Sequence, residues 1–224
     1  MIWSNLDEFF DYINEKSEYV ILRNWEDYSS ANLLNSEDDI DILCRDKTDF
    51  IKAAGTVSLH HAHNRGNYYI NIGTRKIRID IRYIGDGYYC RKWEEKILKN
   101  RILDAKGFYV PNPDDYMYSL LYHALVQKPK LSFLYYEKLN IMFGDIKRNE
   151  TEFLHVLKMY MDKNHFYVDY PLDKAVFLNM TNIWKGALRI NRDIKKELSR
   201  KVFCVCNRIL RLCAKIIHSV NGRI

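Results

Sequence analysis

The sequence predicts an α+β protein, with a small mixed sheet and helices over residues 1–106 and an all-α region over residues 107–224. Two observations support this division. Short apolar runs with strand-like alternation occur only in the first region, and nearly all of the chain beyond them has apolar residues at helical spacing. Between the regions, Gly107, Pro111 and Pro113 lie close together, as is typical of a domain boundary.

The first region is predicted to alternate short helices and strands. Ser4 is the expected N-cap of a helix over residues 5–16, whose apolar residues fall on one face. Apolar runs at residues 18–24 and 38–44 are bounded by charged residues and predict two buried strands. A short helix is expected over residues 47–55, because its last residue is a glycine, the usual helix terminator.

A β-hairpin is predicted next in the chain. Residues 67–73 and 76–84 alternate apolar and polar side chains on either side of a GTRK turn, which contains Gly73. The second strand of this hairpin carries Asp80 between two isoleucines. The hairpin therefore places an acidic residue inside an otherwise apolar strand.

Charge is unevenly distributed along the chain. Residues 1–44 contain eleven Asp/Glu and two Lys/Arg, whereas the remaining residues contain 33 Lys/Arg and 18 Asp/Glu. This asymmetry favours a site that holds cations and a surface that meets an anion, although charged faces without any ligand give the same pattern. The first residues lack the features of a secretory signal, and no run of about 18 apolar residues occurs. We therefore expect a cytoplasmic protein.

Three aspartates lie within two of the predicted apolar strands. Asp39 and Asp41 alternate with Ile40 and Ile42, so both carboxylates are expected on one face of their strand, with Asp80 on a second strand. Carboxylates that lie close together raise one another's pKa, and a divalent cation would relieve that repulsion. Mg²⁺ (or Mn²⁺) is held by a few carboxylates together with substrate phosphates. The pattern predicts such a metal site; a solvated strand end is the alternative.

This arrangement resembles the nucleotidyltransferase (DNA polymerase β-like) superfamily. The matching residues are Asp39 and Asp41 in DDIDIL and Asp80 in RIDIR, within residues 18–84. The resemblance implies a nucleotidyltransferase-like sheet and metal binding by all three aspartates. It also implies that Asp80 acts as the base that activates the acceptor hydroxyl.

The segment after the first strand departs from the family pattern. Members usually carry Gly-Gly or Gly-Ser there, where backbone amides approach the nucleotide phosphates. This chain instead has Arg23 and Asn24, followed by Ser29 and Ser30, which become the candidates for binding the donor. Arg23 would meet a phosphate through its guanidinium fork. The substitution is similar to the phosphocholine-transferase branch (LicD and fukutin-like), which moves a phospho-alcohol from a CDP-linked donor onto a glycan.

A helix over residues 114–128 supplies two further candidates. Superfamily members often place a basic or aromatic residue on the first helix behind the catalytic sheet, facing the nucleotide. By that resemblance His123 and Lys128 are assigned to donor binding, with a purely structural role as the alternative.

The chain from residue 185 onward is strongly basic. It holds eleven Lys/Arg and two Asp/Glu, and an apolar stripe runs through Val202, Val205, Ile209, Leu212 and Ile216. Such a helix can lie on the anionic inner face of a membrane or pack on its own domain. No recognised RNA-binding motif is present, so a nucleic-acid partner is not expected.

Together these features predict a Mg²⁺-dependent transferase. It would move a nucleotidyl or phospho-alcohol group from an NTP or CDP-alcohol donor to a small-molecule or glycan acceptor, as in surface polysaccharide synthesis. The alternatives are a non-catalytic, antitoxin-like binding partner with the same fold, and a toxin-type enzyme that nucleotidylates tRNA or protein. The complete set of carboxylates favours an enzyme, whereas the missing glycines favour a binding partner.

Overall fold

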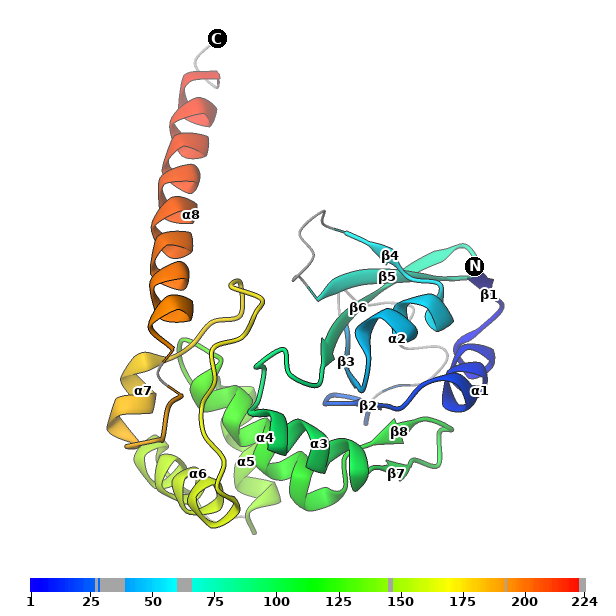
Figure 1. The fold of residues 1–224 in the computed structure, drawn as a ribbon, viewed down its shortest axis with the longest axis horizontal. Coiled ribbons are helices and arrows are strands. Elements are labelled where there is room, and N and C mark those ends of the chain that lie inside the picture. Colours follow the sequence, from blue (N-terminus) through cyan, green and yellow to red (C-terminus); the bar gives the residue numbers. More distant parts are fainter. Residues whose placement is uncertain (27, 29–38, 60–65, 145–146, 192, 222–224) are drawn as a thin grey trace. The chain divides into compact units, whose positions relative to one another are not determined.

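The chain has mixed α and β structure, as predicted (Figure 1). The computed structural model describes residues 1–26, 28, 39–59, 66–144, 147–191 and 193–221. These form two compact units, Met1–Ile190 and Asn191–Ile224. The predicted boundary between residues 106 and 107 falls inside the first unit, in the hairpin of β7 (Ile102–Leu103) and β8 (Tyr109–Val110). Among the described residues beyond 107, the regular secondary structure is helical except for β8 and one isolated bridge between Val168 and Ile190.

A mixed sheet forms the centre of the first unit. In the described part of the chain its strand order is β1-β5-β6-β3-β2, with β4 beside β5. β3 and β6 run parallel at its centre, whereas β2 is antiparallel to β3, and β5 and β6 form the predicted hairpin. The strands are β1 (Ile2–Trp3), β2 (Tyr19–Ile21), β3 (Ile40–Cys44), β4 (Val57–Ser58), β5 (Asn67–Ile72) and β6 (Arg75–Tyr83).

Seven helices are described in the first unit. They are α1 (Leu6–Lys16), α2 (Lys47–Ala54), α3 (Arg91–Lys99), α4 (Pro113–Val126), α5 (Phe133–Met142), α6 (Glu150–Asn164) and α7 (Met180–Lys185). The prediction of Ser4 as the first N-cap is wrong by one residue. The Asn5 side chain accepts the Glu8 backbone N–H at 2.8 Å, while the Ser4 N–H is bound by the Glu8 carboxylate at 2.6 Å. Helix α2 ends at Gly55 in the left-handed conformation (φ 60°), as predicted.

Helix α4 lies at the centre of the helical layer, against α5, α6 and α7. It begins at Asn112, whose side chain accepts the Asp115 backbone N–H, and Pro113 occupies its first turn. Most of its surface is buried, including the polar residues His123 and Ser119. A helix buried on several sides shows little amphipathic pattern, because apolar side chains are needed around most of its circumference.

A buried pair of carboxyl groups joins the end of β6 to α3. Glu94 is fully buried and accepts the backbone N–H groups of Gly85 at 2.7 Å and Tyr89 at 3.1 Å. Asp86 lies beside it and accepts the Tyr88 N–H at 2.8 Å. Burial raises the pKa of Asp86 to about 6, against the opposing effect of Arg82, and burial together with Asp86 raises the pKa of Glu94 well above its ordinary value.

The raised pKa values of Asp86 and Glu94 predict that the unfolding free energy falls as pH rises. A carboxyl group with a raised pKa in the folded state stabilises the fold below its unfolded pKa, and that contribution is lost as pH rises through the folded pKa. For Asp86 the loss begins near pH 3.8 and extends to about pH 6, and for Glu94 it extends well above the ordinary pKa of that group. Glu94→Gln removes one of the two titrating groups and should flatten this dependence.

Urea unfolding between pH 4.5 and pH 7.5 measures the effect. We expect the unfolding free energy of the Glu94→Gln variant to change less over this interval than that of the wild type. Glu95→Gln is the matched control, since the Glu95 side chain is 45% exposed and pairs with Arg91. If the unfolding free energy of the Glu94→Gln variant fell with pH as much as that of the wild type, the raised pKa of Glu94 would be contradicted.

Candidate active site

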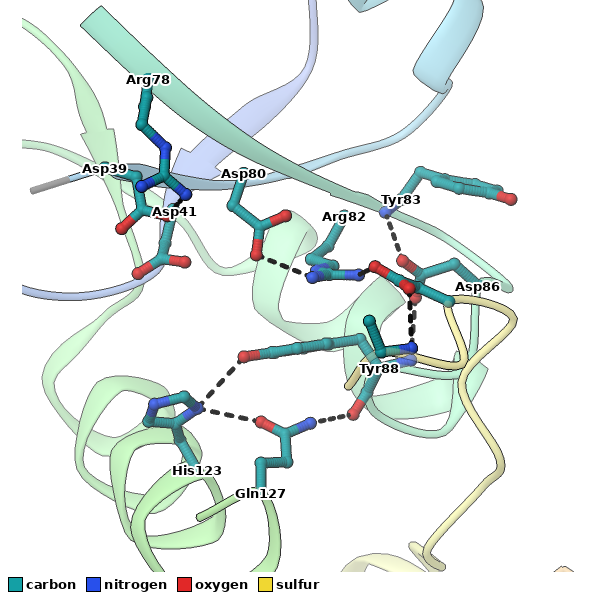
Figure 2. A network of polar contacts seen from close by, with 12 residues as sticks. Asp39, Asp41, Arg78, Asp80, Arg82, Tyr83, Asp86, Tyr88, His123 and Gln127 are labelled. Carbon is teal, nitrogen blue, oxygen red and sulfur yellow. Dashed lines mark hydrogen bonds and ion pairs between the residues drawn. The ribbon is translucent and has the colours of Figure 1, made fainter. Parts of the chain in front are cut away.

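The two central strands bring the predicted aspartates together. Asp41 on β3 and Asp80 on β6 are direct neighbours in the parallel register. Asp39 precedes Asp41 by two residues, and the isoleucine between them is fully buried on the opposite side of the strand. Figure 2 shows all three carboxylates projecting from the same face of the two strands. The predicted gathering of these residues is therefore present in the structure.

Two buried arginines neutralise the central aspartates. Arg23 Nη2 lies 2.7 Å from Asp41 Oδ1, and Arg82 Nη2 lies 2.7 Å from Asp80 Oδ2. Arg82 Nη1 also contacts Asp173 Oδ2 at 3.2 Å, which joins the sheet to a segment 91 residues further along the chain. Both guanidinium groups are almost completely buried. The repulsion expected between the acids is thus offset within the protein by charges from its own chain.

Asp39 lies at the edge of this group. Its carboxylate is 3.5 Å from Arg78 Nη2, and both side chains are substantially exposed, at 38% and 49%. An ion pair of this kind contributes little to stability, about 1 kcal/mol or less. Asp39 is therefore a peripheral member, and the buried pair Asp41 and Asp80 forms the centre.

The pKa of Asp41 reflects its burial and the nearby carboxylates. Burial raises the pKa of Asp41 to about 6, Arg23 opposes the rise, and Asp80 and Asp39 add to it. Near neutral pH the carboxylate is mostly ionised and paired with Arg23. Asp41 Oδ1 is consequently fixed in position by a charge-assisted hydrogen bond.

Three buried polar atoms around these acids have no hydrogen-bond partner among the described residues. They are Asp80 Oδ1, Arg23 Nη1 and Arg82 Nε. Space for the Asp80 carboxylate depends on Gly66, because a Cβ at that position would lie 2.0 Å from Asp80 Oδ1. Unsatisfied buried groups are uncommon in native proteins and often mark the place of a water, an ion or a ligand. Two donors and one carboxylate oxygen are complementary to a group that offers acceptors to the arginines and either a hydrogen-bond donor or a positive charge to Asp80.

A hydrogen-bonded chain connects Asp41 to helix α4. Arg23 Nη2 donates to the Tyr88 hydroxyl at 2.9 Å, and that hydroxyl lies 3.1 Å from His123 Nδ1. His123 Nδ1 is also 3.0 Å from Gln127 Oε1, while Gln127 Nε2 donates to the Tyr88 carbonyl at 2.7 Å (Figure 2). Burial, with Arg23 and Lys128, lowers the pKa of His123 well below its ordinary value. The imidazole is therefore neutral, and it positions Tyr88 instead of carrying a charge to the site.

The residues predicted to bind a donor have different placements. Arg23 is turned inward onto Asp41, and the exposed Asn24 has a left-handed backbone (φ 61°) at the end of the strand that precedes it. Lys128 is half-buried just beyond the end of α4, and its carbonyl accepts the Asn179 side chain at 3.0 Å. Ser29 and Ser30 lie outside the described residues.

Sequence reasoning missed four residues of this network: Arg82, Tyr88, Gln127 and Asp173. Arg82 had a usable signal, since it follows Asp80 by two residues on one strand and must share its face. Tyr88 and Gln127 lie 39 positions apart, and no local pattern joins them.

The described side chains form no group of three or more His, Cys, Asp and Glu arranged to hold a metal ion together. The three aspartates share a face, and Asp41 and Asp80 are direct neighbours in the sheet, but the three do not by themselves form such a group. Comparison of the chain with protein-family models, with curated proteins and with solved structures found no match.

Proposed function

We propose that the chain is a Mg²⁺-dependent transferase of nucleotidyltransferase type. It would move a nucleotidyl or phospho-alcohol group from an NTP or a CDP-alcohol to a hydroxyl of a small-molecule or glycan acceptor. The observation that carries the proposal is the pair Asp41 and Asp80. They are neighbours on parallel strands, and Asp80 Oδ1, Arg23 Nη1 and Arg82 Nε are buried there without a hydrogen-bond partner in the described part of the chain.

The donor set suits a hard divalent cation. Mg²⁺ in phosphoryl-transfer sites is commonly held by one or two carboxylates, with waters and substrate phosphates completing its coordination. Asp41 and Asp80 would provide the protein ligands, and Asp39 would join them from the edge of the group. When bound, the metal would supply charge stabilisation to the reacting phosphoryl group.

The other residues of the network have distinct roles in this proposal. Arg23 and Arg82 hold the carboxylates of Asp41 and Asp80 in place. Each also retains one buried nitrogen, Arg23 Nη1 and Arg82 Nε, that could donate a hydrogen bond to a phosphate oxygen of the donor substrate. Asp80 Oδ1 is assigned to take the proton of the acceptor hydroxyl. Tyr88 fixes the Arg23 guanidinium and is itself held by His123. These contacts pre-organise the site before any substrate arrives.

One observation favours a second candidate function. Because Arg23 and Arg82 already neutralise Asp41 and Asp80, the fold does not require a metal to tolerate these acids. A non-catalytic binding protein of the same fold would have this property. It would bind a nucleotide or another anion through the free arginine N–H groups, without turnover.

Differential scanning fluorimetry separates the two candidates. The full chain is screened with NTPs and CDP-alcohols, each with and without Mg²⁺. For every ligand that raises the melting temperature, release of the leaving group is followed, which is pyrophosphate from an NTP and CMP from a CDP-alcohol. We expect a Mg²⁺-dependent shift with at least one donor and slow hydrolysis or transfer of it. Binding that is independent of Mg²⁺ and never followed by product would support the binding protein. No shift with any donor would contradict both.

A further inference from the structure

Helix α8 (Ile194–Asn221) presents a row of exposed apolar side chains. Ile194, Leu198, Val202, Val205 and Ile209 are each more than half exposed, from 54% to 79%. Their spacing of four, four, three and four residues keeps them on one face of an α-helix. At about 1.5 Å per residue the row extends for roughly 22 Å. An exposed apolar stripe of this length indicates a surface that another apolar phase covers.

The unit that contains this stripe is strongly basic. Residues 191–224 include nine Lys/Arg and two Asp/Glu, a balance of +7. Lys195 and Lys201 are exposed near the start of the helix, and Lys201 forms an i, i+4 pair with Glu197 at 2.8 Å. The apolar stripe is therefore accompanied by an excess of positive charge along the same helix.

We propose that α8 lies flat on the surface of an anionic membrane, with its apolar stripe in the boundary between headgroups and acyl chains. A basic amphipathic helix has this preference because apolar burial and attraction to anionic lipids act together. Charge decides between this occupant and a second copy of the chain, since pairing two α8 helices would bring two segments of the same sign together. Among the described residues, no helix is long and apolar enough to cross the bilayer.

Sedimentation of the full chain with lipid vesicles tests the proposal. The vesicles are pure phosphatidylcholine, or phosphatidylcholine with phosphatidylglycerol at about one third. We expect binding to the anionic vesicles, weak binding to the neutral ones, and a decrease as salt is raised because exposed charges are screened. The variant Val202→Gln/Val205→Gln/Ile209→Gln should lose at least tenfold in partitioning. Its exposed positions carry no core packing, so its melting temperature should match the wild type.

Two further variants test the apolar and the charged contributions separately. Phe133→Gln/Leu134→Gln/Ile141→Gln removes three apolar side chains from α5 that are more exposed than those changed in α8, and it should bind vesicles as the wild type does. Lys195→Gln/Lys201→Gln should reduce partitioning about fivefold for each lysine.

Three results would overturn the proposal. They are equal loss in the α5 and α8 triple variants, equal binding to neutral and anionic vesicles, and absence of vesicle binding together with concentration-dependent dimers that the α8 variant abolishes. The last would identify α8 as a contact between copies. None of these results depends on transferase activity, so the test stands apart from the proposed function.

Discussion

Arg23→Met should lower the unfolding free energy by about 3–5 kcal/mol near neutral pH, because it leaves the buried Asp41 carboxylate without its counter-charge. Asp41 has lost most of its contact with water, and its pKa is raised to about 6 even with the Arg23 guanidinium 2.7 Å away. The variant also removes the N–H that binds the Tyr88 hydroxyl. The loss should shrink at pH 5, since a protonated Asp41 requires no cation.

Chemical denaturation of a double-mutant cycle measures the pair. Arg23→Met/Asp41→Leu replaces both charges by apolar side chains of similar size, and it should recover most of the stability lost in the single variant. Arg78→Met is the matched control, because it breaks the exposed pair with Asp39 on the same sheet and should cost less than about 1 kcal/mol. If Arg23→Met and Arg78→Met cost the same, the buried pair has no special role in stability.

The local elements of the sheet were predictable because their signals lie within short stretches of sequence. Period-two alternation located β3, β5 and β6, and Gly73 marked the turn between the last two, where its φ is 55°. The same alternation predicted that Asp39 and Asp41 share a face. Parallel pairing of β3 with β6 then places Asp80 beside Asp41, which the sequence could suggest only through a family resemblance.

The partners of the acids were not predictable in the same way. Arg23 and Asp41 are 18 residues apart, and Arg82 and Asp173 are 91 apart, so their pairing depends on tertiary packing. The sequence suggested a phosphate as the partner of Arg23, and the structure adds the ion pair with Asp41. The position of the domain boundary also depends on tertiary packing. Gly107, Pro111 and Pro113 mark the β7–β8 hairpin and the start of α4, which are turns within one packed unit.

The arginine pairs also change the expectation for substitutions of Asp41. From charge crowding alone, Asp41→Asn would relieve repulsion and stabilise the protein without metal. In the structure the same change leaves the Arg23 guanidinium buried with a weaker partner, so a loss of stability is expected instead. Asp80→Asn is the cleaner test of chemistry, because Arg82 keeps its second carboxylate, Asp173.

Asp80→Asn should reduce turnover of the donor identified by fluorimetry by about 10³-fold, equivalent to about 4 kcal/mol of transition-state stabilisation. The change removes both a metal ligand and the group assigned to take the acceptor proton, while the amide retains an oxygen for Arg82. Asp39→Asn should have a smaller effect, about tenfold, because Asp39 is at the exposed edge of the group. The measurement is the rate of product release at saturating Mg²⁺, with circular dichroism and melting temperature confirming that each variant is folded. Asp49→Asn, which changes an exposed acid on α2, should retain the wild-type rate.

A folded Asp80→Asn variant with a rate within twofold of the wild type would exclude Asp80 from the chemistry. Equal losses in the Asp39 and Asp80 variants would instead mean that all three carboxylates act together when metal and donor are bound.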